Sequence, residues 1–250
     1  MALAMVDALL EVRVLHPSDA EAAAAGGADR LLVVALGGGR AHSPDAAVVS
    51  AVARATPLPV RALLRLPEDD VPGDTTTGAG LVRLAGLARE YLAAGAEGMA
   101  FGFLTAQLEV DTELCEALAA QLPCPWVFTR AVDHALDHRR AWRQVLGLPG
   151  LDGVLAAGSS LGAAHGHDAL LELCRDPTVA GRLVAAGGVR TEHVPWLLRA
   201  GVRAFHVGSA VRRDGSWDKA HTDPPMVRAW RLLLDDELAR RRGGAVGGGP

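Results

Sequence analysis

The chain has 250 residues, of which 50% are hydrophobic, and its formal net charge at pH 7 is −4. This length suits one domain with a large core, and the acidic balance argues against a nucleic-acid partner, which normally requires a basic stripe. No segment reaches the roughly 20 uninterrupted apolar residues of a membrane span, so we expect no membrane partner.

Short apolar runs alternate with Ala- and Leu-rich helical stretches along the chain, a pattern typical of βα units around a parallel sheet. Strands are expected at residues 9–14, 30–34, 60–65, 98–101, 126–130, 153–156, 183–186 and 204–207. Helices are expected at residues 18–26, 45–55, 79–94, 111–121, 134–146, 163–174, 191–200 and 225–241. This order predicts a single-domain (β/α)8 TIM barrel over residues 1–240, followed by a disordered glycine-rich tail at 241–250.

The first strand carries charge on one face. By the two-residue period of a strand, Glu11 and Arg13 lie on one face, while Leu and Val residues occupy the other. The apolar face would pack under the helices, which directs Glu11 and Arg13 into the barrel. Burying either charge is costly without a partner, so the pattern fits a structural ion-pair network and a ligand site equally well.

Other polar residues follow the strands at the end where barrel enzymes place their active sites. Arg65 closes the third strand and Arg130 the fifth, Asp133 follows in the next loop, and His206 lies near the end of the eighth. Together with Glu11, these are the candidate catalytic residues. Guanidinium groups bind phosphate or carboxylate through paired donors and repel a bare metal cation, so we expect a small anionic ligand and no metal.

The last two strands end in small-residue loops, Gly187-Gly188 and Gly208-Ser209. In TIM barrels these loops often form a phosphate cradle, because glycine lets backbone N–H groups approach the anion closely. With Arg13, these four residues are the candidate anion-binding residues. The same glycines fit a role in turning the chain after a strand, and the sequence leaves both interpretations open.

Cysteines and histidines lack the spacing of a metal site. Cys115, Cys124 and Cys174 are far apart and form no CxxC motif, so we expect reduced core residues of a cytoplasmic protein. His134 and His138 share a face of the helix expected at 134–146, and we assign them to its solvated outer side.

Two irregular segments lie on the expected ligand-binding side. Residues 67–80 are rich in Pro, Gly, Asp and Thr, which fits either a lid or a disordered insertion. The segment at 212–225 follows the last strand, and we expect it to cover the barrel mouth or to meet a neighbouring subunit. The helical outer surface is compatible with a homodimer.

The chain resembles the CutC family from about residue 9 to residue 210. The segments that carry the resemblance are GADR at 27–30, GAEGMAFGFL at 95–104, FTRAVD at 128–133, AGGVR at 186–190 and FH at 205–206. The resemblance implies a TIM barrel linked to copper homeostasis and copper binding, and it leaves open whether a reaction is catalysed.

The resemblance implies that the chain is a divergent member of the CutC family. The family's Glu-Leu-Cys in the second strand is Leu32-Val33-Val34 here, and Thr129 replaces the His of Phe-His-Arg in the fifth. Cu(I) prefers soft ligands such as thiolates, so the copper that the resemblance implies is less expected here. Three functions remain open: copper handling, an enzyme or binder of a phosphorylated or carboxylated metabolite, and a non-catalytic barrel with a decayed site.

Overall fold

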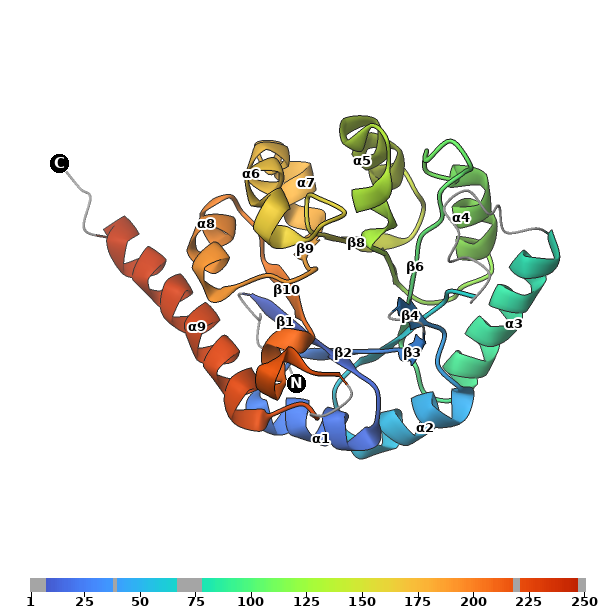
Figure 1. Ribbon diagram of the computed structural model, residues 1–250, viewed down its shortest axis with the longest axis horizontal. Coiled ribbons are helices and arrows are strands. Elements are labelled where there is room, and N and C mark those ends of the chain that lie inside the picture. The colour runs from blue at the N-terminus through green and yellow to red at the C-terminus, as the bar shows by residue number, and fades with distance from the viewer. Residues whose placement is uncertain (1–7, 38–39, 67–77, 218–220, 247–250) are drawn as a thin grey trace.

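The computed structural model describes residues 8–37, 40–66, 78–217 and 221–246, with side chains up to residue 242. A closed barrel of eight parallel strands forms its centre, in the order β1-β10-β9-β8-β7-β6-β5-β2 (Figure 1). These strands are β1 (Leu9–Val14), β2 (Arg30–Val33), β5 (Val60–Leu63), β6 (Gly98–Phe101), β7 (Trp126–Phe128), β8 (Leu151–Ala156), β9 (Leu183–Ala185) and β10 (Ala204–Val207). The predicted TIM barrel is therefore confirmed.

Helices surround the barrel (Figure 1). They are α1 (Pro17–Gly26), α2 (Ala46–Ala55), α3 (Gly78–Ala93), α4 (Thr112–Ala119), α5 (His138–Leu146), α6 (Ala163–Leu173), α7 (Pro177–Arg182), α8 (Val194–Arg199) and α9 (Pro224–Val246). In the part of the chain that the structure describes, none of them is long and apolar enough to cross a membrane. Most of the loop expected at 67–80 lies outside the described residues.

Three elements differ from the sequence prediction. A hairpin of β3 (Ala35–Gly37) and β4 (Arg40–His42) follows β2, and α7 precedes β9. Helix α7 begins at Pro177 and has a cap in Asp176, whose side chain accepts a hydrogen bond from the Thr178 N–H. Helix α9 continues to Val246, so the prediction of a disordered tail from residue 241 was wrong for 241–246, while 247–250 lie outside the described residues.

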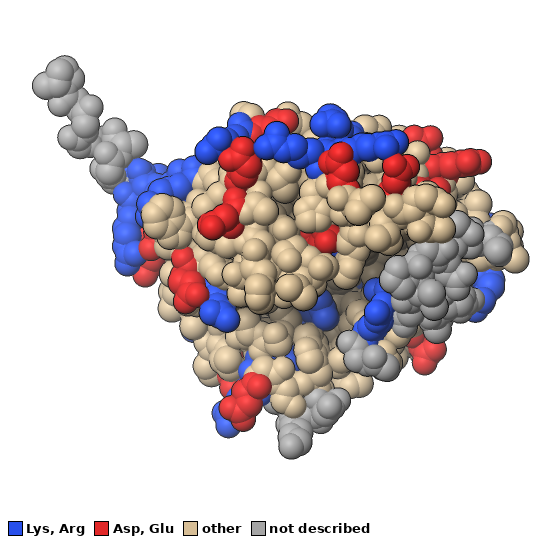
Figure 2. Space-filling model, turned by 45° about the horizontal axis from the view of Figure 1, so that its top comes forward, with Lys and Arg blue, Asp and Glu red and all other residues tan. Residues whose placement is uncertain are grey.

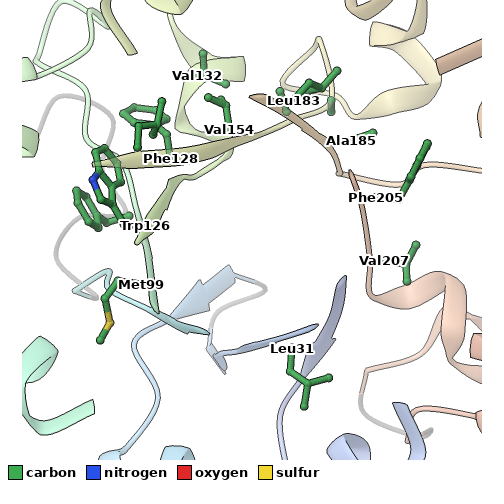
Figure 3. Packing of buried hydrophobic residues seen from close by; sticks show 14 of the residues in the cluster. Leu31, Met99, Trp126, Phe128, Val132, Val154, Leu183, Ala185, Phe205 and Val207 are labelled. Atoms are coloured by element: carbon green, nitrogen blue, oxygen red, sulfur yellow. The ribbon is translucent and has the colours of Figure 1, made fainter. Parts of the chain in front are cut away.

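Apolar residues of the strands form two separate cores, and the inner one has no buried residue from β1 or β10. The larger core lies between the strands and the helices, and Figure 3 shows Leu31, Phe205 and Val207 pointing away from the barrel centre. There the Phe101 and Trp126 rings stack with centroids 4.1 Å apart. The smaller core fills the inside of the barrel with Leu32, Val34, Leu63, Ala100, Val127, Leu155, Val184 and Ala186. Charged residues inside the barrel lie around this apolar layer.

The segment after β10 is anchored to α1 by a buried ion pair. Arg212 donates to the Asp19 carboxylate over 2.6 Å, and both side chains are almost inaccessible to solvent. Asp19 also accepts hydrogen bonds from the backbone N–H groups of Leu15 and Thr222. Beyond this anchor, the Trp217 ring lies near the Arg212 guanidinium on one side and that of Arg13 on the other.

Asp19→Ala should lower the free energy of unfolding by about 3 to 5 kcal/mol, because it leaves Arg212 buried without its counter-charge. Urea denaturation measures this loss. The matched control is Asp235→Ala, which breaks an exposed ion pair with Arg231 and should cost at most about 1 kcal/mol. Equal losses in the two variants would contradict the assigned role of the buried pair.

Candidate functional site

A cavity of about 520 Å³ opens at the carboxyl ends of the barrel strands. Its floor includes Leu32, Leu63 and Leu155, which belong to the inner core. The charged and titratable residues that line it are Arg13, Arg40, Arg65, Arg130, His134 and His206. Among the described residues, no aspartate or glutamate lines it. Figure 2 shows Lys or Arg atoms recessed in the hollow of this face, below a rim where both signs mix.

Glu11 lies under this cavity, fully buried in the barrel. The strand register pairs it with His206 of β10 on one side and Arg30 of β2 on the other. Its carboxylate accepts a hydrogen bond of 2.7 Å from Nδ1 of His206 and one of 2.6 Å from Nε of Arg30. Burial alone would raise the pKa of Glu11, but Arg30 and His206 together hold that pKa well below its ordinary value.

The network continues to the other end of the barrel. Arg30 lies 3.5 Å from Asp152, and Arg61, which is buried, donates to the same carboxylate. Glu11 therefore belongs to a structural ion-pair network inside the barrel, and it does not line the cavity. Arg13, two residues further along the strand, does line it.

Asp133 holds Arg130 in place at the cavity wall. Its carboxylate accepts a hydrogen bond of 2.8 Å from Nε of Arg130 and others from the backbone N–H groups of Ala157 and Gly158. Burial raises the pKa of Asp133, and these donors act in the opposite direction. Because its oxygens are engaged and it does not line the cavity, Asp133 is suited to positioning Arg130.

The glycines after β9 and β10 stand behind the cavity wall. A Cβ on Gly187 would lie 2.6 Å from the Arg130 guanidinium, and a Cβ on Gly208 would lie 2.8 Å from the Trp217 ring. Gly188 has open space around its Cα and a positive φ of 83°. These three glycines and Ser209 do not line the cavity. Gly187 and Gly208 thus leave room for the side chains of Arg130 and Trp217.

Two lining residues were missed from the sequence. Arg40 belongs to the unpredicted hairpin, for which the glycine run at 37–39 was the available turn signal. His134 was placed on the outer face of a helix, but it ends a short 3₁₀ helix, Arg130–His134, and α5 begins only at His138. Asp137 marks that start, because its side chain accepts a hydrogen bond from the Arg140 N–H.

No copper-binding donor set is assembled in the described residues. No three His, Cys, Asp or Glu side chains there group to hold a metal ion. As predicted, Cys115 and Cys174 are buried free thiols, and burial raises their pKa values to about 12 and about 11. The His167 ring stacks on that of His193 at 4.7 Å and does not form a chelate with it. The residues present therefore do not fit Cu(I), which prefers exposed thiolates.

The CutC family model matches residues 8–211. The chain belongs to the CutC family. The family protein CutC of Klebsiella pneumoniae (strain 342) is 31% identical over 202 residues, which cover 80% of this chain and 79% of that protein. The copper homeostasis protein cutC homolog of Homo sapiens is 30% identical over 210 residues, covering 82% and 75%.

A solved structure also matches the fold. It carries the name copper homeostasis protein CutC, comes from Streptococcus agalactiae and is 18% identical, with a TM-score of 0.68. The match covers 80% of this chain and 98% of that one. Both the predicted CutC family and the predicted barrel are thus confirmed.

Glu11→Gln should cost about 3 kcal/mol or more of unfolding free energy at pH 7, because it leaves Arg30 with no buried counter-charge. Since the pKa of Glu11 is lowered by folding, its contribution is complete above the ordinary value of 4.5 and is lost as the pH falls through the folded value. In denaturation experiments from pH 7 to pH 3, the difference in unfolding free energy between the two proteins should begin to shrink below about pH 4.5 and should be smaller at pH 3 than at pH 7. Glu172→Gln, on an exposed pair, is the control, and a constant difference across this range would contradict the prediction.

Proposed function

We propose that this CutC family member binds a small phosphorylated or carboxylated molecule in the mouth cavity. The observation that carries the proposal is the lining itself, with four arginines and no carboxylate among the described residues. Guanidinium groups are the side chains best suited to oxyanions, and low-dielectric walls strengthen their effect. A bound anion would add negative charge that the described lining residues do not supply.

Arg13 is the arginine with the clearest need of a ligand. In the described part of the chain it makes no ion pair, and its Nε has no hydrogen-bond partner. Burial and the neighbouring Arg130 lower the pKa of Arg13 to about 10. Its described side-chain partner is the Trp217 ring, 5.2 Å away. An anion bound here would compensate the desolvation of this guanidinium.

The cavity also weighs against a decayed site. A decayed barrel would leave Glu11 and the arginines in a closed network with nothing above it. Glu11 is in such a network, but an open volume of about 520 Å³ lies over it, with Arg13 and His206 in its wall. A cavity of this volume is large enough for a metabolite.

Copper handling is a second candidate function. It is favoured by the names of the human and Streptococcus relatives, which refer to copper homeostasis. The residues of this chain give it less support, because a positively charged cavity repels a cation and its two most buried thiols lie in the core. A role in copper homeostasis without a copper site in the barrel is compatible with the anion-binding proposal.

Arg13→Met should weaken the binding of inorganic phosphate by about tenfold or more, since a hydrogen bond to a charged group contributes roughly 1.5 to 3 kcal/mol. Methionine keeps much of the apolar stem, and no carboxylate loses its partner, so the fold should persist. Isothermal titration of both proteins measures the difference, with Arg139→Met on the exposed face of α5 as the control. Unchanged affinity in Arg13→Met would overturn the proposed site.

Titration of the reduced, metal-free protein with Cu(I) should reveal no site tighter than about 1 μM, because no soft donor set converges in the described residues. Cys124→Ser is the control for weak binding at its half-buried thiol. Stoichiometric binding below that limit, retained in Cys124→Ser, would restore copper binding as the better proposal.

A further inference from the structure

His206 connects the buried network to the cavity. Only 3% of the residue is exposed, and Glu11 occupies its Nδ1 from below at 2.7 Å. Its other ring nitrogen, Nε2, is buried and has no hydrogen-bond partner in the described residues, although His206 lines the cavity. Buried side-chain nitrogens are normally satisfied, so a structural role for this histidine accounts for Nδ1 and leaves Nε2 unexplained.

The contact with Glu11 fixes which nitrogen carries the proton. An ionised carboxylate has no hydrogen to donate, so Nδ1 must be the donor in this hydrogen bond. Burial lowers the pKa of His206, against the opposing effect of Glu11. In a neutral imidazole with Nδ1 protonated, Nε2 carries a free lone pair.

Burial opposes protonation of His206, the charges of Arg13 and Arg30 add to this effect, and Glu11 acts against it. Glu11 and Arg13 face it from β1, and Arg30 faces it from β2. The other cavity-lining groups that carry or can take a proton are Arg40, Arg65, Arg130 and His134. An anion placed among these groups would offset their positive charge and favour the imidazolium form.

We propose that His206 is the proton-transfer residue of the cavity, and that Nε2 accepts a proton from a phosphorylated or carboxylated ligand. The inference rests on the proposed function and narrows it to ligands with a hydroxyl, or a C–H beside a carbonyl group. The O–H or C–H bond breaks, and the proton forms a bond to Nε2. The electron pair stays on the ligand as an alkoxide or enolate, which the arginines stabilise.

Glu11 is a positioning residue in this scheme. It touches His206 and not the cavity, so it acts by holding the tautomer with Nε2 free and by stabilising the imidazolium that forms. Arg30 keeps Glu11 ionised for this purpose. The arrangement gives the buried carboxylate at the centre of the barrel a role, although it does not line the cavity.

The first test is the protonation state of the wild-type protein. With ¹⁵N-labelled histidine and assignment through the backbone, the ring nitrogens of His206 report their protons at pH 7 without any variant. We expect a protonated Nδ1 and a bare Nε2. A proton on Nε2 in the ligand-free protein would overturn the inference.

The second test uses sulfate, a dianion that does not itself titrate between pH 6 and pH 8. If a bound anion raises the proton affinity of Nε2, protonation of His206 and sulfate binding favour each other, and sulfate affinity should fall by about tenfold or more as the pH rises over this range. His206→Gln should abolish the pH dependence. His134→Asn, which removes the other imidazole of the cavity, should retain it.

The outcomes separate this inference from the proposed function. Sulfate binding that is independent of pH, or whose pH dependence is lost in His134→Asn and kept in His206→Gln, overturns the role of His206 alone. Failure of sulfate to bind the wild-type protein overturns the anion site and the inference with it. If His206→Gln does not fold, the nitrogen signals of the wild-type protein with and without sulfate decide the question.

Discussion

The carboxylate of Glu11 has no access to solvent, and its ionised state at the barrel centre depends on Arg30 and His206. Removing a charge from water costs several kcal/mol, so each partner must be held at the right height by its own strand. The parallel register of β1 with β2 and β10 provides this. The strands therefore hold the His206 ring in one orientation. In that orientation Nε2 is the ring nitrogen that Glu11 leaves unoccupied.

A buried carboxylate also positions a charged side chain in the loops at the carboxyl ends of the strands. Asp133 helps to hold Arg130, and its carboxylate is in turn held by two backbone N–H groups after β8. Gly187 leaves room for the guanidinium that results. Asp133 thus helps to place positive charge at the mouth without lining the cavity itself.

Local patterns predicted the strands well, because the alternation of apolar and charged residues in β1 follows directly from the pleat. The same alternation in Arg61, Leu63 and Arg65 was available and would have indicated a second charged inner face. The sequence did not predict which residue each charged side chain pairs with. Whether Glu11 meets Arg30 or a ligand depends on the register between strands, and no single strand encodes that. Arg40 was missed because the hairpin of β3 and β4 was not predicted, and His134 because a short 3₁₀ helix precedes α5.

The Trp217 ring next to Arg13 belongs to a segment that lies beyond residue 211, where the match to the family model ends. Trp217 therefore packs against Arg13, which lines the cavity, from a part of the chain beyond the family match, and the Asp19–Arg212 pair fastens that segment to α1. A substitution in this segment can change the surroundings of a cavity-lining arginine while every barrel strand stays as it is.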